Sequence, residues 1–174
     1  GLVIRHRKRI PVHMDQATAK VVMQRFGYCF VGSGGYPAIL DSLVDVRPGQ
    51  VISIAGPGGV MEVLPLALDH GGIASIGFRV KNFAYCNDVV RLPPETLQRL
   101  EGLDTLVVDA LRHTPSPSHA TVAQALDWIR QLRPRRAYLT NLLHELDYAK
   151  LRAELPKGVE PAYDGLELEI DPTG

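Results

Sequence analysis

The stretch that decides the fold lies between residues 105 and 140 and reads TLVVDALRHTPSPSHATVAQALDWIRQLRPRRAYLT. The apolar run 105–110 is typical of a buried strand, and 137–140 predicts a second one. Between them we expect a helix that begins at an N-cap, Ser118, and ends at Leu132. Its apolar positions recur at intervals of three and four residues, as in a helix with one buried face: Val122, Ala125, Leu126 and Ile129. This order indicates a helix that covers one face of a sheet.

The residues on the N-terminal side of this stretch are rich in strand patterns. Residues 10–14 predict a short strand, after which Asp15 is the expected N-cap of a helix that runs to Phe26 and ends at Gly27. Two hairpins follow, one formed by 50–55 and 60–68 and one formed by 75–80 and 83–86. A short helix is expected after Pro93-Pro94, up to Leu100.

The residues on the C-terminal side predict one helix and a last pair of strands. Asp147 is the expected start of a helix through Leu155, and 159–170 reads as two strands around the turn Asp164-Gly165. Hairpins mixed with strand–helix–strand crossovers predict an α/β fold with a mixed sheet rather than a uniformly parallel one. At 174 residues, we expect one domain over residues 1–174.

The charge balance excludes a strong general attraction to polyanions. Lys and Arg number 19, as do Asp and Glu, so nothing favours nucleic acid or an anionic membrane as partner. The basic run Arg5–Arg9 is interpreted as a solvated connector, with a phosphate-facing patch as the alternative. Cys29 and Cys86 form neither a redox pair nor a zinc knuckle, and no segment has the length of a membrane span. A cytoplasmic protein is the expectation.

Polar residue types that bind metals follow three of the expected strands. His70 follows 64–69, Asp88 follows 83–87, and Asn141 follows 137–140 with His144 close behind. Because strand ends are rigid supports for loops, these side chains can converge on one site. Each also has an ordinary interpretation: His70 as a turn histidine beside Gly71-Gly72, Asp88 as turn chemistry, and His144 as a partner of Asp147 or part of a helix cap.

His119 is the candidate for proton transfer. If the helix begins at Ser118, the imidazole lies beside backbone N–H groups that attract anions, and a phosphate oxygen can use both. A partly exposed histidine at a helix start is the alternative interpretation.

Several blocks of sequence match one family of hydrolases in their order along the chain. The blocks are Ile10-Pro11-Val12-His13-Met14; His70-Gly71 with Ser75-Ile76-Gly77-Phe78; Ala84-Tyr85-Cys86-Asn87-Asp88-Val89; Asp109-Ala110-Leu111-Arg112; Pro117-Ser118-His119; Tyr138-Leu139-Thr140; Glu145-Leu146-Asp147-Tyr148; and Tyr163-Asp164-Gly165-Leu166. With them the chain resembles the C-terminal two thirds of the metallo-β-lactamase superfamily, specifically the phosphoribosyl 1,2-cyclic phosphate phosphodiesterase-like hydrolases.

The resemblance implies a partial αββα sandwich and a site for two divalent metal ions, zinc or manganese, that hydrolyses a phosphodiester of a small cyclic phosphate. His70 would bind the first metal and Asp88 would bridge both. His119 would contact the phosphate or protonate the leaving oxygen. Asn141 stands where the family carries a ligating histidine, so Asn141 and His144 are assigned to substrate binding.

One ligand motif of the family does not occur in this sequence. The motif is His-x-His-x-Asp-His, and the resemblance places it upstream of residue 1. Two alternatives to the hydrolase therefore stay open: a catalytically degenerate member that acts as an interaction module, and an RNA-processing hydrolase of the same superfamily. The expected partner is a small phosphorylated substrate, with a second copy of the chain as a further candidate.

Overall fold

The computed structural model describes residues 2–170, which form two compact units with their boundary between Ile52 and Ser53. In the first unit, two short strands pair in parallel. Its elements are α1 (Leu2–His6), β1 (Ile10–His13), α2 (Gln16–Phe26), α3 (Tyr28–Val31) and β2 (Leu40–Leu43). Met14, Ala19 and Phe30 form its small buried core.

The helix expected after Asp15 is confirmed, but two details of this unit differ from the sequence prediction. The Asp15 carboxylate accepts a hydrogen bond from the backbone N–H of Thr18, as an N-cap does. The helix ends at Phe26 with Gly27 as its C-cap, as predicted, but Gly27 has a right-handed φ of −53° instead of a left-handed one, and α3 follows directly. The start of the basic run is also helical, because Arg5 and His6 form the last turn of α1.

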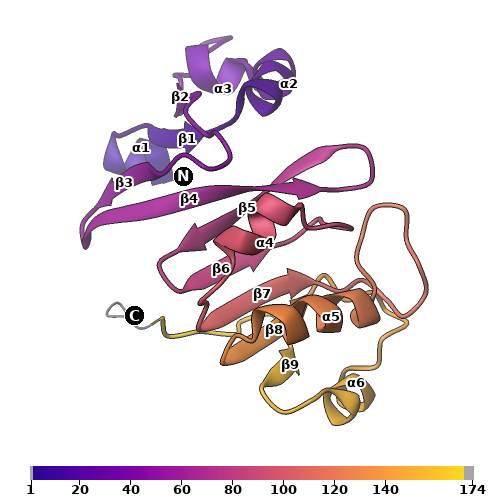
Figure 1. Ribbon diagram of the computed structural model, residues 1–174. Coiled ribbons are helices and arrows are strands. Elements are labelled where there is room, and N and C mark those ends of the chain that lie inside the picture. The colour runs from indigo at the N-terminus through magenta and orange to yellow at the C-terminus, as the bar shows by residue number, and fades with distance from the viewer. Residues whose placement is uncertain (1, 171–174) are drawn as a thin grey trace. The chain divides into compact units, whose positions relative to one another are not determined.

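The second unit is built on a mixed sheet of seven strands (Figure 1). The strands lie side by side in chain order: β3 (Ile52–Gly56), β4 (Gly59–Asp69), β5 (Ala74–Val80), β6 (Phe83–Cys86), β7 (Thr105–Asp109), β8 (Arg136–Thr140) and β9 (Val159–Pro161). The strands from β4 to β6 are antiparallel neighbours, and those from β6 to β9 are parallel. Both predicted hairpins and the mixed α/β class are confirmed.

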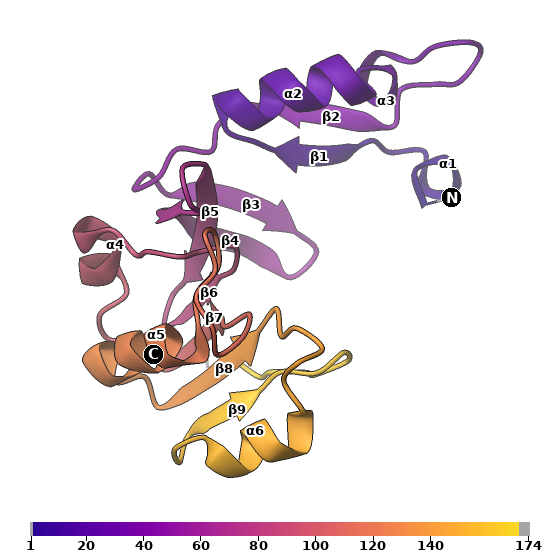
Figure 2. The same ribbon diagram turned by 90° about the vertical axis from the view of Figure 1, so that its right-hand side faces the viewer.

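Two helices cover one face of this sheet. They are α4 (Pro94–Arg99) and α5 (Val122–Leu132), and Figure 2 shows both on the same side of the strands. The third, α6 (Tyr148–Glu154), lies against β9 and begins at the expected N-cap, Asp147. The core between helices and sheet contains Leu66, Leu106 and Leu139, which are completely buried. Among the described residues, no helix has the length and apolar character needed to cross a bilayer.

The start of α5 differs from the prediction. The N-cap is Thr121, not Ser118, because the Thr121 hydroxyl accepts a hydrogen bond from the backbone N–H of Gln124 while the Gln124 side chain accepts one from the backbone N–H of Thr121. This reciprocal capping box satisfies two donors that a helix end otherwise leaves unpaired. His119 therefore lies in the loop before the helix, and its predicted position beside helical N–H groups is wrong.

The prediction of two strands over 159–170 is half wrong. Only β9 forms, and the residues after the turn at Asp164-Gly165 have no strand partner. Leu166, Leu168 and Ile170 instead line a cavity of about 310 Å³ together with side chains of the sheet face that the helices leave free. Burial of these apolar side chains competes with strand pairing in a segment of this kind.

The direction of the strands places four loops at one edge of the sheet. β6, β7 and β8 are parallel, so their carboxyl ends meet at the same edge. Because β5 is antiparallel to both β4 and β6, the carboxyl end of β4 lies at that edge as well. The chain segments that follow these four strands carry His70, Asp88, His119 and Asn141.

Candidate metal and phosphate site

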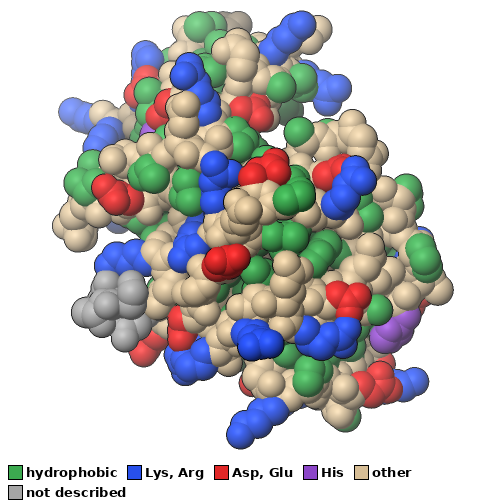
Figure 3. Space-filling view, viewed as in Figure 1, with side chains coloured by type: hydrophobic (Ala, Val, Ile, Leu, Met, Phe, Trp, Pro, Cys, Tyr) green, Lys and Arg blue, Asp and Glu red, His purple; other side chains and the backbone are tan. Residues whose placement is uncertain are grey.

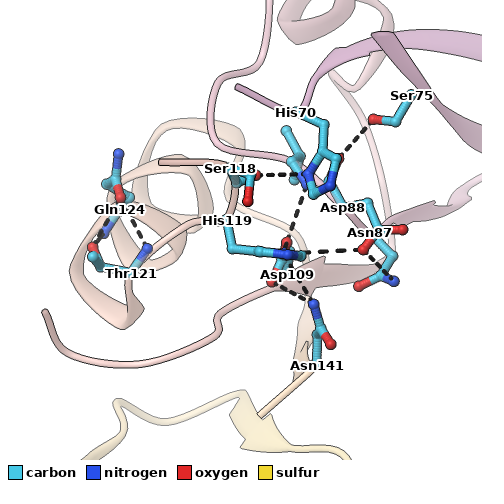
Figure 4. A network of polar contacts seen from close by, with 11 residues as sticks. His70, Ser75, Asn87, Asp88, Asp109, Ser118, His119, Thr121, Gln124 and Asn141 are labelled. Carbon is cyan, nitrogen blue, oxygen red and sulfur yellow. Dashed lines mark hydrogen bonds and ion pairs between the residues drawn. The ribbon is translucent and has the colours of Figure 1, made fainter. Parts of the chain in front are cut away.

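The site of interest lies within the second unit, where these four segments meet (Figure 4). The side chains of His70, Asp88 and His119 converge there, and their ligand atoms all lie within 4.8 Å of one another. The imidazole rings of His70 and His119 are edge to face, with centroids 4.7 Å apart. Residues separated by up to 49 positions in the sequence thus form one cluster.

His70 is held by a tight loop. Oδ1 of Asp69 accepts hydrogen bonds from the backbone N–H of Gly71 at 2.9 Å and of Gly72 at 3.4 Å, and both glycines have positive φ. Arg91 forms an ion pair with the same carboxylate and holds the pKa of Asp69 below its usual range. The backbone therefore bends sharply at these two glycines, and this bend fixes the backbone from which the imidazole projects.

The tautomer of His70 follows from its contact with the neighbouring loop. Nδ1 lies 2.8 Å from the backbone carbonyl oxygen of Ser118, which can only accept, so Nδ1 carries the proton. In the neutral ring, Nε2 is then the nitrogen without a proton. A histidine whose Nδ1 donates to a carbonyl and whose Nε2 is free has the arrangement that ligating histidines adopt in metal sites.

Asp88 presents its carboxylate from an unusual backbone conformation. Its φ is 53°, in the left-handed region, and its carbonyl oxygen accepts a hydrogen bond from the Ser75 hydroxyl at 2.6 Å. The side chain is 53% exposed, and Oδ1 lies 4.0 Å from Nδ1 of His119. Burial, together with the negative charges of Asp88 and Asp109, raises the pKa of the nearby Tyr85. Because the Asp88 side chain is half exposed, its carboxylate is accessible to a ligand from solvent.

Asp109 is a member of the site that the sequence interpretation did not assign. It ends β7, is completely buried, and its Oδ2 lies 2.7 Å from Nδ1 of His119. The same oxygen accepts from the backbone N–H of Val89 at 3.1 Å, which makes it an acceptor, so His119 donates through Nδ1. Burial raises the pKa of Asp109, and the His119 contact partly offsets this. The signal in the sequence was an acidic residue directly after the apolar run Leu106–Val108.

Asn141 also belongs to this cluster, whereas His144 lies outside it. Asn141 has a φ of 61°, and its Nδ2 lies 3.4 Å from Oδ1 of Asp109 and 3.1 Å from Nδ1 of His119. His144 is exposed and is not among the residues whose ligand atoms gather with those of His70. Its assignment to substrate binding stays a prediction.

The donor set fits a divalent cation. Two imidazoles and one carboxylate are the ligand types that zinc accepts, and manganese also binds carboxylate and imidazole in proteins. In both histidines Nδ1 contacts an oxygen: the Ser118 carbonyl in the case of His70 and the Asp109 carboxylate in the case of His119. Nε2 of each ring is thereby the nitrogen available to a cation or a substrate. Three potential ligands with an open side are the minimum of a catalytic rather than a closed structural zinc site.

Comparison with known proteins agrees with this geometry. Residues 2–141 match the model of the beta-lactamase superfamily domain. A crystal structure of a diphosphatase from the PhnP family aligns with a TM-score of 0.81 and 28% identity, over 94% of this chain and 60% of that chain. The metallo-β-lactamase fold protein YhfI from Bacillus subtilis aligns with a TM-score of 0.68 and 16% identity, over 94% of this chain and 66% of that one.

A curated protein from Porphyromonas gingivalis (strain ATCC BAA-308 / W83), named octanoyltransferase, is 29% identical over 172 residues. The match covers 97% of this chain but 34% of that protein, so its name describes a molecule of which this chain resembles about a third. The chain likewise spans 60% of the diphosphatase. Because the family model matches well over half of the sequence and the fold and site agree with it, the chain belongs to the metallo-β-lactamase superfamily.

Proposed function

We propose that this chain belongs to a metal-dependent hydrolase that cleaves a phosphoester bond in a small substrate, with a cyclic phosphodiester as the preferred class. The observation that carries the proposal is the convergence of His70, Asp88 and His119 at the sheet edge, with ligand atoms within 4.8 Å. Perturbed carboxylates beside histidines in an open site are typical of catalytic centres.

His70 and Asp88 have a different role from His119. His70 and Asp88 hold the cation through Nε2 and a carboxylate oxygen. When bound, divalent cations polarise phosphoryl oxygens and lower the pKa of water, which supplies a nucleophile near neutral pH. His119 contacts the phosphate and donates a proton from Nε2 to the leaving oxygen.

Asp109 makes this proton transfer favourable. Its buried carboxylate holds Nδ1 of His119 at 2.7 Å, so the ring has a fixed orientation. When Nε2 takes up a proton, the imidazole becomes positive, and the neighbouring negative charge compensates it. The arrangement is that of an acid–base histidine oriented by a carboxylate, which does not itself need to change protonation state.

Diphosphate hydrolysis is the second candidate reaction. The similar solved structure at 28% identity is described as a diphosphatase, and a diphosphate offers the same charged phosphoryl oxygens to the cation and to His119. The two substrates differ in the leaving group, an alkoxide in the cyclic ester and a phosphate in the diphosphate.

An RNA-processing role is less favoured by the surface. Binding of a nucleic-acid backbone needs a broad positive surface. Figure 3 shows Lys and Arg side chains interspersed with Asp and Glu over the visible face, in keeping with equal numbers of both in the sequence. A small substrate requires only the local charges of the site.

The test uses the full-length protein that carries this sequence, incubated with zinc or manganese and assayed for phosphate-ester hydrolysis on a ribose 1,2-cyclic phosphate and on a nucleoside diphosphate derivative. We expect metal-dependent turnover that falls at least about 100-fold in His119→Asn, within the range for loss of an acid–base group. His113→Asn is the matched control, because this exposed histidine lies in the same loop.

The degenerate alternative makes a different prediction for metal content. A non-catalytic member would bind no cation at this site, whereas the hydrolase binds it and loses it in His70→Ala and Asp88→Asn. A full-length protein that contains metal yet hydrolyses neither substrate would sink the proposed reaction, and one that contains no metal would support the interaction module.

A further inference from the structure

The face of the seven-stranded sheet that α4 and α5 leave free (Figure 2) carries a cavity of about 310 Å³. Its floor crosses three neighbouring strands, because Tyr85 of β6 pairs with Val107 of β7, and Val107 pairs with Tyr138 of β8. Side chains alternate between the two faces of a strand, so this row lies opposite the buried core beneath the helices. Residues of the segment 162–170 form the remaining wall.

The cavity adjoins the candidate metal site. Three residues that line it stand shortly before residues of the site in the sequence: Tyr85 before Asp88, Val107 before Asp109, and Thr140 before Asn141. Because β6, β7 and β8 are parallel, these strand ends lie at the same edge of the sheet. The negative charges of Asp88 and Asp109 contribute to the raised pKa of Tyr85. Tyr85 therefore lines the cavity and lies within electrostatic reach of both carboxylates.

The lining of the cavity favours an uncharged aromatic group. Among the described residues that line it, none carries a charge, so a phosphate would be poorly stabilised there. The side chains of Val107 and Tyr138 are buried, whereas Tyr85 is 40% and Tyr163 57% exposed. The ring of Tyr163 packs edge to face against that of Tyr148, with centroids 6.4 Å apart, which restricts its orientation. Two exposed phenol rings beside an apolar cavity can stack on a planar ring of a ligand.

We propose that this cavity is the subsite for the part of the substrate that carries no phosphate, and that this part is a planar aromatic group such as a nucleobase. The inference rests on the proposed hydrolysis, and it narrows the substrate class to phosphoesters of nucleosides. The phosphate lies at the metal cluster, and the base enters the cavity beside Tyr85 and Tyr163. Tyr163 is then a residue that determines specificity, because it binds the base and does not contact the reacting atoms.

The first experiment measures binding without any reaction. Adenosine, which carries an aromatic base, and ribose, which carries none, are titrated into the full-length protein and followed by isothermal titration calorimetry. We expect adenosine to bind at least about 10-fold more tightly than ribose, as base stacking on aromatic side chains provides. Leu168→Trp, which fills the cavity from its half-buried wall, should abolish this preference. Tyr36→Ala is the control, because this exposed tyrosine does not line the cavity.

The second experiment measures selectivity in the metal-loaded full-length protein. The readout is the ratio of kcat/KM for adenosine 2′,3′-cyclic phosphate to kcat/KM for ribose 1,2-cyclic phosphate. In Tyr163→Ala this ratio should fall about 10-fold, because the stacking contact is lost, and the change should lie in KM for the adenosine substrate. Tyr163→Phe keeps the ring and should keep the ratio. Since Tyr163 is largely exposed, neither substitution disturbs the core.

The two experiments separate the subsite from the reaction. Absence of adenosine binding to the full-length protein, as when another segment fills the cavity, would overturn the subsite even if ribose 1,2-cyclic phosphate is hydrolysed. The same holds if Leu168→Trp leaves adenosine affinity unchanged or Tyr163→Ala leaves the ratio unchanged. A protein that binds adenosine through this cavity yet hydrolyses no phosphoester would defeat the proposed reaction and support the subsite.

Discussion

At the scale of single residues, the site depends on a close approach of two loops at Gly71. A Cβ atom at this position would lie 2.2 Å from the carbonyl oxygen of Pro117 and 2.9 Å from Cα of Ser118. The φ of Gly71 is also positive, at 71°. This packing holds the Ser118 carbonyl against Nδ1 of His70. Because glycine has no side chain, the two loops can approach closely enough to orient His70, a candidate metal ligand.

We expect Gly71→Ala to destabilise the protein more than Gly72→Ala. Both changes add a Cβ atom at positive φ, which costs about 1–2 kcal/mol, but only Gly71 has backbone atoms within 4 Å of the new atom. Overpacking adds about 1–3 kcal/mol. Chemical denaturation of the two variants measures the difference, and equal losses would show that the loops are not in tight contact.

At the scale of elements, the first turn of α5 decides where the histidine loop ends. The capping box of Thr121 and Gln124 starts the helix three residues later than Ser118 would. The loop 111–120 is thereby long enough to carry both the Ser118 carbonyl and His119 back to the sheet edge. By setting the start of α5, Thr121 and Gln124 thus keep His119 in the loop that reaches the site.

Thr121→Ala should lower the free energy of unfolding by about 1 kcal/mol, because it removes the side-chain acceptor for the Gln124 backbone N–H. Ser118→Ala is the matched control, since Ser118 contributes its carbonyl oxygen to His70 and has no part in the capping box. Urea denaturation of both variants tests this. A larger loss in Ser118→Ala would contradict the assignment of the cap.

At the scale of the whole molecule, the residues of the candidate site come from separate loops of the second unit. His70 follows β4, Asp88 follows β6, and His119 precedes α5. A cation held by His70 and Asp88, which lie on separate loops, is bound only by the folded unit. Binding and folding of this unit are therefore thermodynamically linked.

Zinc at about 100 times its dissociation constant should stabilise the full-length protein by about 2.7 kcal/mol, visible as a higher Tm. A chelator should reverse the shift. Asp88→Asn should reduce it, because an amide is a poorer ligand than a carboxylate, while the exposed His113→Asn should leave it intact. If the shift persists undiminished in Asp88→Asn, the cation binds elsewhere.

The sequence alone specifies most of the elements and four of the residues that meet at the site, His70, Asp88, His119 and Asn141. Apolar periodicity identified α5, the N-caps Asp15 and Asp147 marked two helix starts, and alternating runs identified both hairpins. These signals are local, since each depends on residues a few positions apart. The placement of His70 and Asp88 after strands was readable for the same reason.

How these residues contact one another follows from the folded structure and not from local patterns. The contact of Asp109 with His119 and that of Asn141 with Asp109 join loops 10 and 32 residues apart, and no local pattern specifies such pairs. Likewise, residues 162–170 do not form the second predicted strand, and their apolar side chains instead line a cavity with residues of the sheet. The order of the strands and the burial of apolar side chains bring these groups together, and both arise only when the chain folds.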